Sequence, residues 1–161
     1  MAIRAGVLTI SDKGARGERE DTSGAAARVL LAEAGVEVVR VAIVPDERDR
    51  IADTLREWCA DSLDLVLTTG GTGLAPRDVT PEATRAVLDY EVPGIAEALR
   101  ADGLRRTPFA MLSRAVAGVR GRTLIVNMPG SERAVRENLA VLLPVLPHAI
   151  ATLRGEQGDH A

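Results

Sequence analysis

Four short apolar runs recur along this sequence, and each one stops at a small, acidic or proline residue. They cover residues 5–10, 36–44, 65–69 and 123–128, with stretches of helical pattern between them. Near-continuous apolar runs are typical of strands that are buried on both faces of a parallel sheet. Strands and helices that alternate in this way connect through right-handed crossovers and leave helices on both faces of the sheet. The sequence therefore predicts an open α/β sheet.

The intervening segments carry the end signals of helices. Helical spacing of apolar residues places helices at 22–34, 46–60, 80–89, 95–104 and from 131 towards 153. Thr80 before Pro81 is a good start for one of these helices, and Ser131 is a good cap for the last. Pro144 and Pro147 are expected to bend that last helix, because proline lacks the backbone N–H that a helix interior needs.

Length and composition set further limits. With 161 residues, the chain is expected to form one domain over residues 1–155, followed by a tail, residues 156–161, that frays. Cys59 is the only cysteine, which excludes an intrachain disulfide and a multi-cysteine metal site. A net charge of −3 and only 2% aromatic residues argue against nucleic acid as a partner. We recognise no signal peptide and no apolar run of membrane-spanning length, and we expect a cytoplasmic protein without a membrane partner.

The loops after the four apolar runs begin at Ser11, Asp46, Gly70 and Pro129. If the strands are parallel, all four loops leave the carboxyl edge of the sheet, where open α/β sheets bind their ligands. The small and acidic residues on these loops would then form one site.

The stretch TTGGTG, residues 68–73, is the strongest candidate for a ligand-binding loop. Glycines let backbone N–H groups approach an anion closely, and a following helix adds a favourable dipole. The stretch matches neither G-x-x-x-x-G-K-[ST] nor G-x-G-x-x-G, and no lysine follows it to neutralise a phosphate. The alternative is an ordinary strand-to-helix turn in which the glycines accept positive φ.

Asp46 and Asp78 suggest what replaces the lysine. Two carboxylates beside a polyphosphate repel it unless a divalent cation lies between them, and Mg²⁺ is commonly held by one or two carboxylates plus substrate phosphates. Each acid could instead be structural, Asp46 as a helix cap and Asp78 as a turn residue. Their shared place at one predicted sheet edge, beside the glycine loop, favours a magnesium-binding pair.

Five segments, in order along the chain, carry a family resemblance. They are LTISD, VPDE, TTGGTGLAPRDVTPEAT, VPG and LSRAVAGVRGRTLIVNMPGS, at residues 8–12, 44–47, 68–84, 92–94 and 112–131. Together they resemble the molybdopterin adenylyltransferases of molybdenum cofactor biosynthesis, and are similar to the G domain of gephyrin. The resemblance implies a three-layer α/β/α sandwich whose mostly parallel sheet carries one antiparallel strand, expected near residues 109–119.

The resemblance also implies a reaction. The terminal phosphate of molybdopterin would attack the α-phosphorus of Mg-ATP, releasing pyrophosphate and leaving adenylylated molybdopterin. By the same resemblance, Asp46 and Asp78 would be the catalytic acids that hold Mg²⁺. The substrate-binding residues would be Ser11, Asp12, Gly70, Gly71, Thr72, Gly73, Ser113, Pro129, Gly130 and Ser131. Glu132 departs from the pattern, since many relatives have proline there. The family typically forms trimers, and a downstream molybdate-insertion protein is an expected partner.

Two rival functions remain open from the sequence. The chain could be a non-catalytic molybdopterin-binding or carrier protein of the same fold. It could also be a generic mononucleotide-binding domain that acts on another substrate. Release of pyrophosphate from ATP in the presence of molybdopterin would distinguish an adenylyltransferase from both.

Overall fold

A six-stranded sheet in the order β2-β1-β3-β6-β5-β4 forms the centre of the computed structural model, which describes residues 2–156. Residues 157–161 of the expected tail lie outside the described residues. The strands β2, β1, β3 and β6 pair in parallel, whereas β5 runs antiparallel to both β6 and β4. The strands are β1 (Arg4–Ile10), β2 (Glu37–Val44), β3 (Leu65–Thr69), β4 (Tyr90–Glu91), β5 (Ala117–Arg120) and β6 (Thr123–Met128). A mostly parallel sheet with one antiparallel strand is therefore confirmed.

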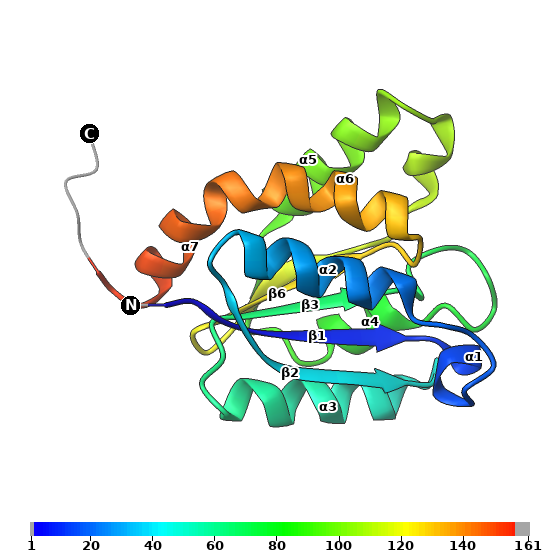
Figure 1. The fold of residues 1–161 in the computed structure, drawn as a ribbon, viewed down its shortest axis with the longest axis horizontal. Coiled ribbons are helices and arrows are strands. Elements are labelled where there is room, and N and C mark those ends of the chain that lie inside the picture. Colours follow the sequence, from blue (N-terminus) through cyan, green and yellow to red (C-terminus); the bar gives the residue numbers. More distant parts are fainter. Residues whose placement is uncertain (1, 157–161) are drawn as a thin grey trace.

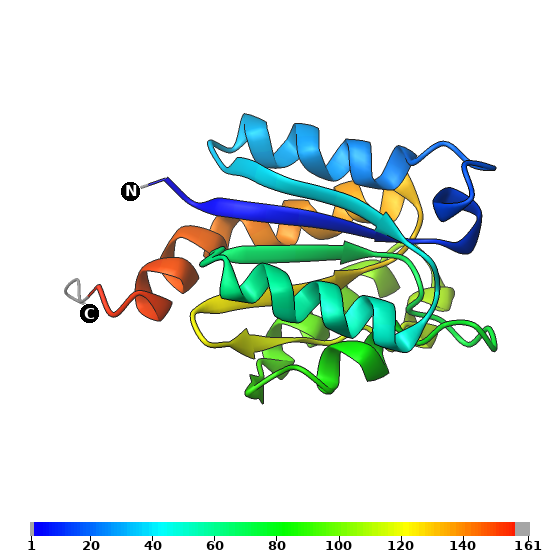
Figure 2. The ribbon, with the colours of Figure 1, turned by 90° about the horizontal axis from the view of Figure 1, so that it is seen from below.

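Helices cover both faces of this sheet. One group of buried apolar residues joins the sheet to α2, α5, α6 and α7, and a second joins it to α3 and α4. Figure 1 shows α2, α6 and α7 above the sheet and α3 beneath it, and Figure 2 shows α3 crossing the opposite face. The helices are α1 (Asp12–Ala15), α2 (Thr22–Glu33), α3 (Arg48–Ala60), α4 (Thr80–Arg85), α5 (Pro93–Leu104), η1 (Pro108–Leu112), α6 (Glu132–Leu142), η2 (Leu143–Val145) and α7 (Leu146–Leu153). The predicted three-layer sandwich is confirmed.

Several predicted boundaries were wrong. The helix expected over 80–89 ends at Arg85, because residues 90–91 pair with β5 as a short strand. Thr80 is not the cap of α4. Its hydroxyl donates to the Gly70 carbonyl at 2.9 Å, and Val79 occupies the cap position. The antiparallel strand begins only at Ala117, because part of the expected stretch forms the 3₁₀ helix η1.

The segment Glu132–Leu153 is long and apolar enough, by those two criteria alone, to cross a membrane. In the structure it forms α6, η2 and α7, which bury one side against the sheet. η2 interrupts it at Pro144, as the prolines predicted, and its apolar side packs on the sheet through Val135, Leu139 and Leu146.

The strand order reverses between β1 and β3, which positions the site. The chain adds β2 on one side of β1 and then crosses over to place β3 on the other side. Ligands of open α/β sheets bind at such a point. Here the end of β3 presses on the end of β1: Gly70 has φ +96°, and a Cβ at this residue would lie 2.3 Å from the carbonyl oxygen of Ile10. Only glycine fits there.

Candidate active site

The glycine loop, residues 70–73, is fixed at its start and leaves three backbone donors open. The N–H of Gly70 donates to the Met128 carbonyl at 3.0 Å, and the N–H of Thr80 donates to the Gly71 carbonyl at 3.2 Å. The N–H groups of Gly71, Thr72 and Gly73 donate to no acceptor within residues 2–156. Backbone N–H groups that the protein leaves unpaired are suited to bind an anion.

Asp46 and Asp78 flank this loop. Asp46 follows the end of β2, and Asp78 lies two residues before α4. A Cβ on Gly71 would lie 3.2 Å from Asp46 Oδ1, and a Cβ on Gly73 would lie 3.0 Å from Asp78 Oδ2. Both acids line a polar hollow of about 240 Å³, together with Ser11, Gly70, Gly71 and Gly130. The structure thus brings the two acids together at the glycine loop.

Asp46 is held in place by a reciprocal pair of hydrogen bonds with Asp12. The N–H of Asp12 donates to Asp46 Oδ2 at 2.9 Å, and the N–H of Asp46 donates to Asp12 Oδ1 at 3.0 Å. Burial raises the pKa of Asp46 above its ordinary value, and the carboxylates of Asp12 and Asp78 act in the same direction. An ionised Asp46 therefore lies where a cation would stabilise it.

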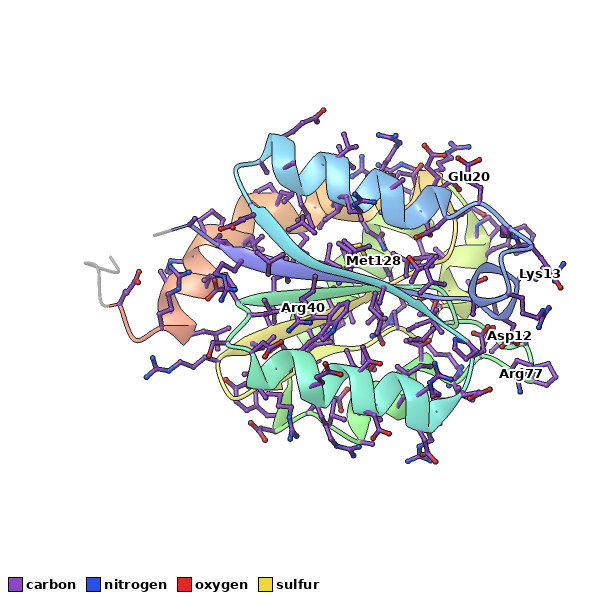
Figure 3. All side chains as sticks on the ribbon, turned by 60° about the horizontal axis from the view of Figure 1, so that its bottom comes forward. Asp12, Lys13, Glu20, Arg40, Arg77 and Met128 are labelled. Carbon is purple, nitrogen blue, oxygen red and sulfur yellow. The ribbon has the colours of Figure 1, made fainter. Side chains whose placement is uncertain are left out.

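Arg77 does not supply that cation, because its charge is taken up by Asp12. Its Nε and Nη2 each donate to the Asp12 carboxylate at 2.9 Å, and Figure 3 shows the two side chains together at the carboxyl edge of the sheet. This bidentate contact lowers the pKa of Asp12. Asp46 Oδ1 and Asp78 Oδ1 accept no hydrogen bond from residues 2–156, so both acids keep an oxygen free. Two such carboxylates fit Mg²⁺, which prefers oxygen ligands and takes the rest from substrate and water.

A second hollow adjoins the same loop. This apolar cavity, of about 310 Å³, lies between α5, η1 and α6. Its walls include Leu99, Phe109 and Leu112. The predicted substrate-binding residues divide between the two hollows: Ser11, Gly70, Gly71 and Gly130 line the polar one, and Thr72, Gly73, Ser113 and Pro129 line the apolar one.

Two of the predicted substrate-binding residues line neither hollow. The Asp12 side chain turns towards Arg77, and the Ser131 hydroxyl accepts the N–H of Ala134 as the cap of α6. Glu132, the residue that departs from the family pattern, also lies outside both hollows and pairs with Arg136 at 3.0 Å on the surface of α6. The negative charge of Glu132 is therefore neutralised by Arg136 on the same helix.

Arg114 is the most connected residue that the sequence interpretation missed. Its guanidinium donates to the carbonyls of Gly73 at 2.8 Å and Asp78 at 2.9 Å, and to both carboxylate oxygens of Glu82 at 2.8 and 2.9 Å. The backbone N–H of Arg114 donates to the Thr72 carbonyl at 2.8 Å. Arg114 therefore fixes the end of the glycine loop relative to Asp78. No local sequence signal reveals contacts between residues this far apart in the chain.

Asp21 was also missed, although a local signal exists. It precedes a helix and accepts the N–H of Gly24 at 2.9 Å, which is an N-cap contact. It also accepts the hydroxyl of Thr9 at 2.8 Å and lines the polar hollow. An acidic residue directly before Thr22 would have identified the cap.

Comparisons with known proteins identify the family of this chain. Residues 6–148 match the family described as "Probable molybdopterin binding domain". The chain is 47% identical over 152 residues to the molybdenum cofactor synthesis protein cinnamon of Drosophila melanogaster, and 42% identical over 161 residues to gephyrin of Dictyostelium discoideum. The matches cover 92% and 94% of this chain, but only 25% and 22% of those longer proteins.

Shorter relatives match along nearly their whole length. The molybdopterin adenylyltransferase of Helicobacter pylori J99 is 42% identical over 158 residues, which are 96% of this chain and 90% of that protein. A crystal structure of the molybdopterin biosynthesis enzyme MoaB of Thermus thermophilus superposes with a TM-score of 0.90 at 59% identity, covering 95% of this chain and 97% of the other. The resemblance expected from the sequence is confirmed, and this chain belongs to the molybdopterin-binding domain family of molybdenum cofactor biosynthesis proteins.

Proposed function

We propose that this protein is a molybdopterin adenylyltransferase, which transfers AMP from ATP to molybdopterin in molybdenum cofactor biosynthesis. One observation carries the proposal: the open N–H groups of the glycine loop lie beside two aspartates at the strand-order reversal. A relative of nearly the same length, the Helicobacter pylori protein, is named for this activity. That name supports an enzyme over a carrier.

The reaction exchanges one phosphorus–oxygen bond for another. An oxygen of the terminal phosphate of molybdopterin forms a bond to the α-phosphorus of ATP, while the bond from that phosphorus to the oxygen bridging to the β-phosphate breaks. Pyrophosphate leaves with the electron pair. A phosphate monoester is already ionised near neutral pH, so the attack needs no general base, and positioning and charge neutralisation dominate such transfers.

The chain's own residues supply the positioning. The N–H groups of Gly71, Thr72 and Gly73 would bind phosphate oxygens. Thr80 and Arg114 hold the two ends of that loop in place through the contacts described above. Asp46 and Asp78 would hold Mg²⁺, which supplies neutralisation of the phosphate charge when it is bound.

We further propose ATP as the nucleotide, a cytoplasmic location, a homotrimer as the assembly, and a downstream molybdate-insertion protein as a partner. The family resemblance supports ATP, the trimer and the insertion partner. Light scattering of the purified chain tests the trimer, with a mass of three chains expected, and a monomer would contradict it.

Pyrophosphate release from molybdopterin and Mg-ATP tests the function. We expect release by the wild type and its loss, by about 1,000-fold or more, in Asp78→Ala, while molybdopterin binding persists. Asp53→Ala on the exposed face of α3 is the matched control and should keep full activity. Undiminished release by Asp78→Ala would contradict the assigned role. Tight molybdopterin binding without release would favour the carrier, and release that does not need molybdopterin would favour the generic nucleotide-binding domain.

A further inference from the structure

One side chain that lines the apolar cavity is an amide without a hydrogen-bond partner among the described residues. Asn138 lies on α6, is 9% exposed and lines the cavity. Neither of its amide atoms makes a hydrogen bond within residues 2–156. Every fully enclosed side-chain polar atom in that part of the chain has a partner, so the Asn138 amide must open onto space. The cavity is the space that it lines.

Most other polar side chains that line the cavity already make a hydrogen bond within the protein. Arg100 Nη1 donates to the Ala115 carbonyl at 2.8 Å, and Glu137 accepts Arg133 Nε at 3.0 Å. The Ser113 hydroxyl accepts the N–H of Ala115 at 3.3 Å, and Thr107 accepts the N–H of Phe109 at 3.3 Å. Among the described polar side chains that line the cavity, only those of Thr72 and Asn138 make no hydrogen bond at all within the protein.

We propose that the apolar cavity is a subsite for a fused heteroaromatic ring, and that Asn138 is the residue that recognises the ring's hydrogen-bonding edge. This inference rests on the proposed function, because both of its substrates, a pterin and an adenine nucleotide, carry such a ring. A carboxamide presents a donor beside an acceptor. The edges of both ring systems present an acceptor beside a donor, which is the matching pattern.

The two hollows divide the chemistry of such a ligand. Leu99, Phe109 and Leu112 offer apolar surface for the ring faces, and about 310 Å³ lies within the usual range of ligand cavities, about 300–1,000 Å³. The polar hollow, with Asp46 and Asp78, suits phosphates and their cation instead. The glycine loop contributes to both, so ring and phosphate would lie on its two sides.

Equilibrium titrations with molybdopterin and with ATP plus Mg²⁺ test the subsite and identify its occupant. Asn138→Leu removes both hydrogen-bonding atoms, and Asn138→Asp keeps the shape but removes the donors. We expect each variant to lower the affinity for one ligand by about 10- to 100-fold and to change the affinity for the other by less than about twofold. The reason is that a ring edge left unpaired in a buried site is strongly disfavoured. A selective loss of molybdopterin assigns the pterin to the cavity, and a selective loss of ATP assigns the adenine.

Arg136→Gln is the matched control, because it changes a polar side chain on the exposed side of the same helix, away from the cavity; both affinities should stay unchanged. Thermal melting of both Asn138 variants shows whether they fold, and the shape-conserving change Asn138→Asp guards against misfolding of Asn138→Leu. Affinities unchanged for both ligands, equal weakening of both, or no binding of either ligand by the wild type would overturn the subsite.

The outcome for the subsite is separable from that for the reaction. If the wild type releases pyrophosphate but the Asn138 variants bind both ligands normally, the subsite fails and the transferase stands. If Asn138 selects one ring but no pyrophosphate appears, the transferase fails and the subsite stands.

Discussion

The polar hollow and the apolar cavity share the glycine loop but are built from different parts of the fold. The polar hollow collects residues that follow β1, β2 and β3, and its side chains are held by hydrogen bonds such as the pair between Asp12 and Asp46. The apolar cavity collects residues of α5, η1 and α6, and one of its walls, Phe109, is 75% exposed. In this fold the strand ends place charge, whereas the packing of helices determines shape.

The largest expected effect compares a packed core residue with a wall of the apolar cavity. Leu55 on α3 is fully buried, and Leu55→Ala should cost about 2–5 kcal/mol of unfolding free energy through lost contacts and a new cavity. Leu99 on α5 already borders open space, so Leu99→Ala should cost about half as much. Urea unfolding measures both. Equal costs would mean that the apolar cavity is closed in solution, and a surface-like loss for Leu55→Ala would show that the register of α3 is wrong.

A glycine pair tests how tightly the polar hollow is built. Gly71 and Gly121 both have positive φ, +69° and +60°. A Cβ on Gly71 would lie 2.3 Å from the Thr80 hydroxyl, whereas a Cβ on Gly121 would meet no atom within 4 Å. Gly121→Ala should therefore cost about 1 kcal/mol for the backbone alone, and Gly71→Ala about 2–3 kcal/mol with loss of activity. Similar losses of stability for the two variants in thermal melts would show that the glycine loop can shift to accommodate a Cβ.

Arg114→Lys tests the residue that links the end of the glycine loop to Asp78. A lysine cannot reach the carbonyls of Gly73 and Asp78 and the Glu82 carboxylate together, because it lacks the fork of the guanidinium. We expect kcat to fall about tenfold, which is about 1.4 kcal/mol, with little change in KM for molybdopterin. Arg120→Lys, which loses one bond to the Val87 carbonyl, should affect stability but not kcat. A fall in kcat for both variants would reduce Arg114 to a structural role.

The smallest expected effect concerns the charge of Asp46. Because its pKa is raised in the folded protein, ionised Asp46 opposes folding at pH values above that pKa, and this penalty disappears below the ordinary carboxyl pKa of 3.8. Asp46→Asn should therefore stabilise the metal-free protein at pH 7 by less than about 1 kcal/mol, and not at all near pH 3. Excess Mg²⁺ should reverse the order of the melting temperatures, because only the wild type keeps both carboxylates. Melting temperatures that do not respond to Mg²⁺ would argue against a metal at Asp46 and Asp78.

These two regions also differ in how far the sequence could predict them. Asp46 and Gly70 each follow an apolar run, and parallel strands bring their carboxyl ends together, so the polar hollow could be expected from pattern alone. Asn138 and Leu99 lie on helices whose neighbours are set by tertiary packing, and their helical spacing shows only that they face inwards. Thr80 has the pattern of a cap, in which its hydroxyl would accept a backbone N–H of the helix. In the structure the hydroxyl donates to the Gly70 carbonyl instead, a contact that no local pattern indicates.

The glycine loop is tied along its whole length: Gly70 to β6 and the end of β1, Gly71 to Thr80, and Thr72 and Gly73 to Arg114. Such a segment cannot swing shut over a bound nucleotide as a mobile lid does. Its backbone is fixed by contacts within the fold, while the N–H groups of Gly71, Thr72 and Gly73 make no hydrogen bond within residues 2–156. Reorganisation during each turnover is thereby avoided, because the ordering was completed when the chain folded.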